Sequence, residues 1–531
     1  MRALLCLALG LSAALPRPAA AQRVGGVELI ELTIAEAHRA MLDRTLTARA
    51  LVEAYLERIE AYDRRGPALN AIILVNPASL ARADSLDAAL ARTGRLTGPL
   101  HGIPFIVKDN YDTHDLPTSA GSAALATSQP ADDAFQVRRI REAGAVVLAK
   151  SNMAEFAFTP YETVGSRLPG YTFNPYALNR VPAGSSGGTA AAVAANLGLV
   201  GLGTDTGNSI RGPSSHTALV GIRSTMGLTS RDGIVPLSAT RDVGGPMART
   251  VEDAVRVLDV IAGTDPADPV TREADARRPA SYLDVLGSAR LDGVGIGVVG
   301  QIARTETADP EVLARFDEAL EDLRALGARV VDDFRIPELE SLREGLNCSR
   351  FRYDLERYLE TVPEPPYRTV AEIAESGDVH VTVLPRLRNM LEEGATDPER
   401  DDGCLRAARN EARLRDAVRA AMAEQEVVAL VYPTWNNPPR LIGDLESPHG
   451  NNSQALSPPT GFPALTIPMG FVRAGTLPVG LQILGDAWDE PTILEIAHAY
   501  ERATRHRRPP TTTPALPRAE GAGAGGPSPR R

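Results

Sequence analysis

Residues 184–189 read Gly-Ser-Ser-Gly-Gly-Thr, and residues 203–211 read Gly-Thr-Asp-Thr-Gly-Asn-Ser-Ile-Arg. In both segments serine lies among glycines, which let the backbone approach a ligand closely and turn its amides toward an anion. The alanine-rich stretch between them, residues 190–202, is predicted to be a helix whose positive end faces Ser185 and Ser186. The two segments are therefore predicted to be loops that stabilise developing negative charge.

A serine in such a loop needs a base, because a hydroxyl is a poor nucleophile until its proton is removed. Of the eight histidines, His216 is nearest to Ser209 along the chain, and it remains an alternative base. Lysine is the better candidate. Of the 56 lysine and arginine residues, only Lys108 and Lys150 are lysines. Since arginine keeps its proton and a buried amine can lose it, these two positions are the ones where a titratable amine is available.

The two lysines both follow short apolar runs. Residues 103–107 are expected to form a buried strand that carries Lys108 into the protein, which suits a desolvated base. Lys150 follows residues 146–148, and we expect it to form an ion pair or to hydrogen-bond the next loop. Lys108 is therefore favoured as the base.

Three segments together resemble the amidase signature family: residues 102–109, 184–188 and 203–211. Further matching segments are residues 150–156, 461–465 and 477–482, so that the resemblance runs from about residue 30 to residue 508. It implies an α/β fold, a single large domain with a central mixed β-sheet flanked by many helices. It also implies hydrolysis of a small carboxylic amide to an acid plus ammonia or an amine, without a cofactor or a metal.

The resemblance also assigns roles to individual residues. It implies that Ser209 is the nucleophile, that Ser185, usually held by a cis peptide bond, relays the proton, and that neutral Lys108 is the base. Attack by Ser209 would give a tetrahedral oxyanion and then an acyl-enzyme that water hydrolyses. The backbone amides expected to form the oxyanion hole are those of Thr206, Gly207, Asn208 and Ser209. The residues expected to support the loops are Ser186, Asp205 and Arg211.

The chain departs from the family pattern at two places. Asn208 stands where the family usually has a second glycine, and we expect it to be tolerated because asparagine adopts left-handed backbone readily. Residues 223–225, Arg-Ser-Thr, replace a commoner Lys-Pro-Thr, which leaves the local loop geometry open.

Apolar patterns elsewhere indicate strands that alternate with helices, as in an α/β protein. Helices are expected after Thr33, with Glu36 completing a capping box, and after Thr47. A further helix is expected over residues 310–326. Strands are expected at residues 146–148, 294–299 and 427–431.

The chain divides into three predicted parts. Residues 1–21 have the three parts of a secretory signal peptide, which predicts a secreted or periplasmic protein. Residues 22–515 form the amidase signature domain, within which a variable helical segment at about residues 339–417 is a candidate cover for a site. Residues 516–531 have the composition of a disordered tail. Cys348 and Cys404 remain after signal cleavage, either paired or as buried thiols.

Charge and context restrict the partners. The net charge of −11, without a basic stripe, argues against nucleic acid. A small amide is the expected ligand, with no stable membrane span after signal cleavage and a possible homodimer.

Two other functions are considered. A G-x-S-x-G reading makes Ser186 the nucleophile of an α/β-hydrolase esterase, although residues 179–183 lack the required preceding strand. An amidotransferase-type subunit would act only in a complex, and a leader peptide argues against it.

Overall fold

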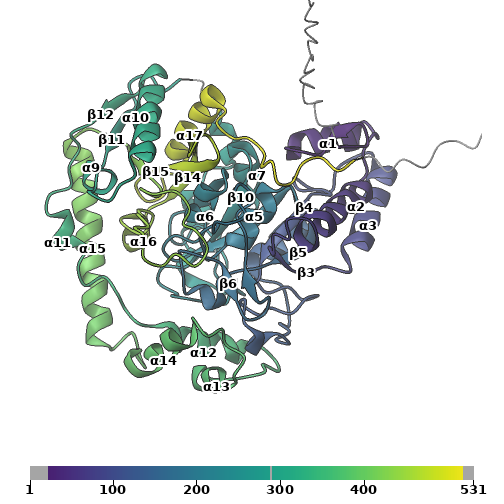
Figure 1. The fold of residues 1–531 in the computed structure, drawn as a ribbon, viewed down its shortest axis with the longest axis horizontal. Coiled ribbons are helices and arrows are strands. Elements are labelled where there is room, and N and C mark those ends of the chain that lie inside the picture. Colours follow the sequence, from purple (N-terminus) through teal and green to yellow (C-terminus); the bar gives the residue numbers. More distant parts are fainter. Residues whose placement is uncertain (1–21, 288–289, 518–531) are drawn as a thin grey trace, which may run out of the picture.

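A mixed sheet of 11 strands is the main feature of the computed structural model, which describes residues 22–287 and 290–517 (Figure 1). The predicted α/β class with a central mixed sheet is confirmed. From one edge to the other the strands are β12 (Arg329–Val331), β11 (Gly295–Val298), β13 (Ala429–Pro433), β15 (Leu477–Leu484), β14 (Ala464–Val472), β9 (Val220–Arg223), β10 (Val243–Ala248), β8 (Val200–Asp205), β4 (Pro104–Lys108), β5 (Val146–Ser151) and β3 (Ile72–Val75). Two small sheets pair β1 (Arg23–Val24) with β2 (Val27–Glu28) and β6 (Val164–Gly165) with β7 (Gly170–Tyr171).

Three central strands bring chemically active residues to one edge of the sheet. Strand β4 runs parallel to β8, so its last residue, Lys108, ends on the same side as the last residue of β8, Asp205. Strand β10 runs antiparallel to β8 and places its first residue, Val243, opposite Asp205. Because all residues of the three strands are buried, their sequences are continuous runs without polar alternation.

Two series of helices pack on this sheet. In the first series, α5 and α6 contact each other; α5 also contacts β4, β8 and β10, and α6 contacts β9, β14 and β15. In the second series, α4 contacts α7, α7 contacts α17, and α17 contacts α10. The helices are α1 (Ile34–Leu42), α2 (Ala48–Arg58), α3 (Ser79–Thr93), α4 (Phe135–Glu142), α5 (Gly187–Ala194), α6 (Arg211–His216), α7 (Val251–Ile261), α8 (Ala274–Arg277), α9 (Gly300–Ala303), α10 (Pro310–Ala325), α11 (Leu339–Leu342), α12 (Phe351–Thr361), α13 (Val370–Glu375), α14 (Leu384–Glu393), α15 (Asp402–Glu424), α16 (Ser457–Thr460) and α17 (Glu490–Thr504).

Local sequence signals place most element boundaries correctly. The Thr33–Glu36 capping box and the Thr47 cap both form, and α10 ends one residue before its predicted end. The helix predicted over residues 190–202 is wrong at both ends. It begins earlier, at Gly187, and ends at Ala194, after which Asn196 takes a left-handed conformation and the chain enters β8. The branched Val200 and the glycines beside it pack in the sheet, so tertiary burial overrides the helical tendency of the alanines.

Residues 346–411 form a separate helical layer, which we call the cover. It contains α12, α13, α14 and the first part of α15, and in Figure 1 the first three of these helices lie apart from the large sheet, joined to it by the long α15. Their apolar residues form a second hydrophobic core with the loops around Phe156 and Val235. A disulfide between Cys348 and Cys404 joins the start of the cover to the start of α15.

The ends of the chain carry two predictions that lie largely outside the described residues. These are the signal peptide at residues 1–21 and all but the first two residues of the predicted tail. Within the described ranges, no helix is both long enough and apolar enough to cross a membrane.

Candidate active site

Lys108 is a fully buried amine at the end of β4. Its Nζ donates a hydrogen bond to Ser185 Oγ at 2.7 Å and to Thr204 Oγ1 at 2.7 Å. Burial lowers the pKa of Lys108 to about 7, and the opposing charges of Asp205 and Asp242 limit the decrease. The amine is therefore uncharged in a large fraction of molecules near neutral pH, as a base requires.

Ser185 lies in a tight loop just before α5. The Gly184–Ser185 peptide bond is cis, and the serine is fully buried. The loop needs glycine at position 184, because a Cβ there would come within 2.2 Å of the Glu162 carbonyl oxygen. The Ser185 carbonyl accepts a hydrogen bond from the Ala154 amide at 3.0 Å. These contacts fix the hydroxyl beside Lys108.

Ser209 lies in the loop between β8 and α6 and borders a cavity of about 680 Å³. The Ser186 amide donates a hydrogen bond to the Ser209 carbonyl at 3.3 Å, so the two serine loops are in direct contact. Among the described residues the Ser209 hydroxyl has no hydrogen-bond partner, Ser185 included. Hydrogen bonds between a nucleophile and its base are often loose before substrate binds.

Four consecutive backbone amides, those of residues 206–209, border the same cavity. No acceptor in the described part of the chain takes a hydrogen bond from any of them. Backbone amides without partners are rare in a folded protein unless they face solvent or a ligand. The loop can therefore donate several hydrogen bonds to one oxyanion.

Asn208 ties the two serine loops together. Its Nδ2 donates to the Gly184 carbonyl at 2.9 Å and to the Pro160 carbonyl at 3.3 Å. Gly212 leaves room for this side chain, since a Cβ there would come within 2.2 Å of Asn208 Oδ1. The expectation of left-handed backbone is wrong, because neither Gly207 nor Asn208 has a positive φ. The role of the asparagine at this position is to hydrogen-bond the neighbouring loop.

A buried ion network supports the Ser209 loop. Asp205 accepts hydrogen bonds from Arg211 Nε at 3.0 Å and from the Ile210 amide at 3.2 Å, and Arg211 also donates to the Ser453 carbonyl at 2.9 Å. Arg223 donates to the Asp205 carbonyl. Burial alone would raise the pKa of Asp205, but the two guanidinium groups lower it below its ordinary value. The carboxylate thus stays charged and holds both ends of the loop.

The residues weighed as alternatives have other surroundings. Lys150 Nζ donates to the Tyr111 carbonyl at 2.6 Å and lies 3.6 Å from Asp109, so it joins loops, as expected. The Ser186 hydroxyl donates to the Thr204 carbonyl at 3.2 Å and does not border the cavity. Burial lowers the pKa of His216 to about 3, and its ring stacks near Trp435 without a hydrogen bond to Ser209 in the described residues.

Three residues of the site were missed by sequence reasoning. Thr204 belongs to the quoted segment, and its position one residue before Asp205 was the available signal. Arg223 was noted only as a departure from a pattern. Asp242 carried no local signal, because it reaches the site through the pairing of β10 with β8.

The cavity lies between the Ser209 loop and the cover. Its wall includes Phe158 and Tyr161, two of the aromatic residues near the sequence motifs, and the Cys348–Cys404 disulfide. From the cover it takes chiefly Leu346, Phe351, Arg386, Met390 and Glu411. The helical segment predicted at about residues 339–417, which includes the cover, thus contributes a large part of the cavity wall. The wall offers both apolar and charged surface.

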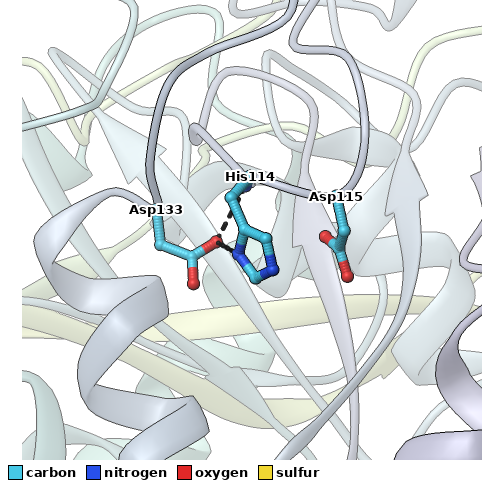
Figure 2. A group of neighbouring side chains, drawn as sticks. All are labelled: His114, Asp115 and Asp133. Atoms are coloured by element: carbon cyan, nitrogen blue, oxygen red, sulfur yellow. Dashed lines mark hydrogen bonds and ion pairs between the residues drawn. The ribbon is translucent and has the colours of Figure 1, made fainter.

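One group of side chains elsewhere resembles a metal site. His114, Asp115 and Asp133 lie close together, with Asp133 and Asp115 on either side of the imidazole (Figure 2). His114 Nδ1 is 3.0 Å from Asp133 Oδ1, and Arg141 pairs with Asp115 at 2.6 Å and with Asp133 at 3.1 Å. Arg141 already compensates the two carboxylates, so this group is an ion cluster that connects a loop to α4.

Comparison with known proteins identifies the family. The family model described as Amidase matches residues 50–494. This chain belongs to the amidase family. The amidase is 34% identical to a probable amidase of Arabidopsis thaliana, over 90% of this chain and 91% of the relative. It is 33% identical to a glutamyl-tRNA(Gln) amidotransferase subunit of Streptomyces coelicolor, over 90% of this chain and 96% of that relative.

Among solved structures, the amidase resembles a peptide amidase from Stenotrophomonas maltophilia, with a TM-score of 0.81 and 38% identity. The match covers 90% of this chain and 98% of that one. The predicted activity class is confirmed: the amidase is a hydrolase that acts on carbon–nitrogen bonds of amides.

Proposed function

We propose that the amidase works through Lys108, Ser185 and Ser209. Neutral Lys108 takes a proton from Ser185 as Ser185 takes one from Ser209, and the Ser209 oxygen attacks the amide carbon. The amides of residues 206–209 bind the resulting oxyanion. The proton returns through Ser185 to the leaving nitrogen, and water then hydrolyses the acyl-enzyme. The 2.7 Å hydrogen bond between a fully buried lysine and Ser185 is the observation that carries this proposal.

We further propose that the substrate is a peptide-like amide. A relative that is 38% identical over nearly its whole length is a peptide amidase. The cavity volume of about 680 Å³ is within the range of sites that bind extended small molecules. Its wall combines aromatic side chains with backbone and charged groups, which suits an acyl part carrying both side chains and peptide bonds.

We propose that the protein acts alone in an oxidising compartment. The apolar run near the N-terminus supports export, and the Cys348–Cys404 disulfide supports an environment in which disulfides persist. The alternative is an assembly like that of the amidotransferase subunits among its relatives. Acting alone here means without a different partner protein; a homodimer is compatible with it, and light scattering of the purified protein tests for one.

A labelling experiment with the purified single chain tests the mechanism. A fluorophosphonate probe should modify Ser209, and the Ser209→Ala variant should not be labelled. The variant should also be inactive on a dipeptide C-terminal amide, in an assay that measures the release of ammonia. Ser186→Ala serves as the matched control, since the esterase alternative requires Ser186 as the modified residue. Activity that requires glutamine, ATP or a partner protein would favour the amidotransferase alternative. Labelling at Ser186 would overturn the proposed mechanism.

A further inference from the structure

Asp242 is a buried carboxylate that joins two walls of the cavity. It lies immediately before β10, and one oxygen accepts a hydrogen bond from Thr206 Oγ1 at 2.5 Å. The other oxygen accepts from the backbone amides of Leu237 and Ser238, both at 2.9 Å. The carboxylate therefore connects the predicted oxyanion loop to the turn formed by residues 237–241.

This turn is also connected to the cover. Asp354, on α12, accepts a hydrogen bond from the Ala239 amide at 2.9 Å. Arg241 Nε donates to Glu411, on α15, at 2.8 Å, and the same guanidinium donates to the Leu346 carbonyl beside the disulfide. Both ends of the cover thus bind the turn that Asp242 holds.

The turn and the oxyanion loop face the same space. Leu237, Ser238, Thr240 and Arg241 border the cavity together with Thr206 and Ser209. A continuous set of hydrogen bonds therefore runs from the cover to the turn, and through the Asp242 carboxylate to the side chain of Thr206. Hydrogen bonds to a carboxylate are shorter and stronger than those between neutral groups, which favours a firm connection.

We propose that Asp242 is a positioning residue, which holds the oxyanion loop in its active arrangement through Thr206 and couples that loop to the cover. This inference rests on the proposed function, because it requires the amides of residues 206–209 to bind the oxyanion. Asp242 does not line the cavity, and its hydrogen bonds go to Thr206, Leu237 and Ser238 rather than to Ser209. Asp242 acts on the position of the backbone amides of residues 206–209, and therefore on kcat. Substrate binding, and therefore KM, depends less on Asp242.

The charges around Asp242 supply a second readout. The groups that face it are Lys108 on β4, Arg223 on β9, and Arg350 and Asp354 at α12. Burial raises the pKa of Asp242 to about 6, and its negative charge raises the pKa of Lys108 against the effect of burial. A neutral residue at position 242 therefore makes Lys108 easier to deprotonate.

The test compares Asp242→Asn and Thr206→Val with the wild-type enzyme on a dipeptide amide. Each variant should lower kcat about 10- to 100-fold with little change in KM, less than the ~100- to 1000-fold cost of removing an oxyanion donor outright. In Asp242→Asn alone, the acid limb of the kcat profile should move to lower pH. Thr206→Ser, which keeps a hydroxyl, should have a higher kcat than Thr206→Val. Asp317→Asn, an exposed carboxylate on α10, is the matched control.

The outcomes separate this inference from the proposed function. If Asp242→Asn folds, is labelled at Ser209 and keeps its kcat and pH profile, the positioning role is wrong while the mechanism stands. If wild-type enzyme is not labelled at Ser209, the mechanism itself fails. Should Asp242→Asn not fold, Thr206→Val decides: a wild-type kcat in that variant contradicts the inference, and a reduced kcat that Thr206→Ser partly restores supports it.

Discussion

Cys348 and Cys404 form a disulfide 56 residues apart in sequence, and both cysteines border the cavity that contains Ser209. The bond closes a chain segment that comprises α12, α13 and α14. The disulfide thus joins the two ends of the cover at the wall of this cavity.

Breaking this bond should weaken the cover more than the sheet. A closed loop of this length stabilises a folded protein by about 4 kcal/mol in the chain-entropy model. We expect a Cys348→Ser, Cys404→Ser double variant to unfold at lower urea concentration and to show a raised KM, because the cavity wall loosens. Urea titration and kinetics with a peptide amide measure both. Unchanged KM in the double variant would show that the cover does not depend on the disulfide.

The pH dependence of kcat should report the buried amine. Because the proposed base, Lys108, can accept a proton only when neutral and its pKa is lowered to about 7, activity should rise with pH through that value. Below it, kcat should fall about tenfold per pH unit. If His216 were the base, the acid limb would lie near pH 3, where its own pKa lies. A kcat profile with an uncharged amide substrate separates the two.

Lys108→Met should abolish turnover and yet stabilise the fold. The unfolded chain binds a proton at the ordinary pKa of 10.5, whereas the folded lysine releases it near 7. Between these values the unfolded state holds more protons, so wild-type stability decreases as pH falls through the window. Methionine removes that dependence. Thermal melts of both proteins at pH 7.5 and pH 10 should show the larger gain for the variant at the lower pH; equal gains would contradict a depressed pKa.

Asn208→Gly restores the family pattern but should cost stability. The substitution removes the hydrogen bonds to the Gly184 and Pro160 carbonyls, which together are worth about 1–3 kcal/mol. Labelling of Ser209 should persist, since no backbone amide is lost and neither Gly207 nor Asn208 needs positive φ. Urea unfolding and probe labelling on the same preparation test this. A variant as stable as wild type would show that the asparagine does not join the loops.

The features that could be predicted from the sequence are those that depend on interactions between residues close together in the chain. The capping residues Thr33 and Thr47, the apolar run before Lys108 and the serine loops all act within a few positions, and they were placed correctly in the fold. The contact of Asp242 with Thr206 depends on two strands pairing 38 positions apart at Asp205 and Val243. No local pattern encodes that register. The prediction that the helix continues after Ala194 was wrong for the same reason, since burial in the sheet decides the conformation of those residues.

Both lysines of the chain are fully buried, and the Nζ of one of them, Lys108, hydrogen-bonds Ser185. Acylating reagents aimed at primary amines thus meet no lysine on the outer surface of the folded molecule. A lysine adduct formed under native conditions therefore requires a local opening that lets the reagent reach a buried amine. Amine chemistry, which is unselective in most proteins, becomes here a direct report on how often the buried interior opens.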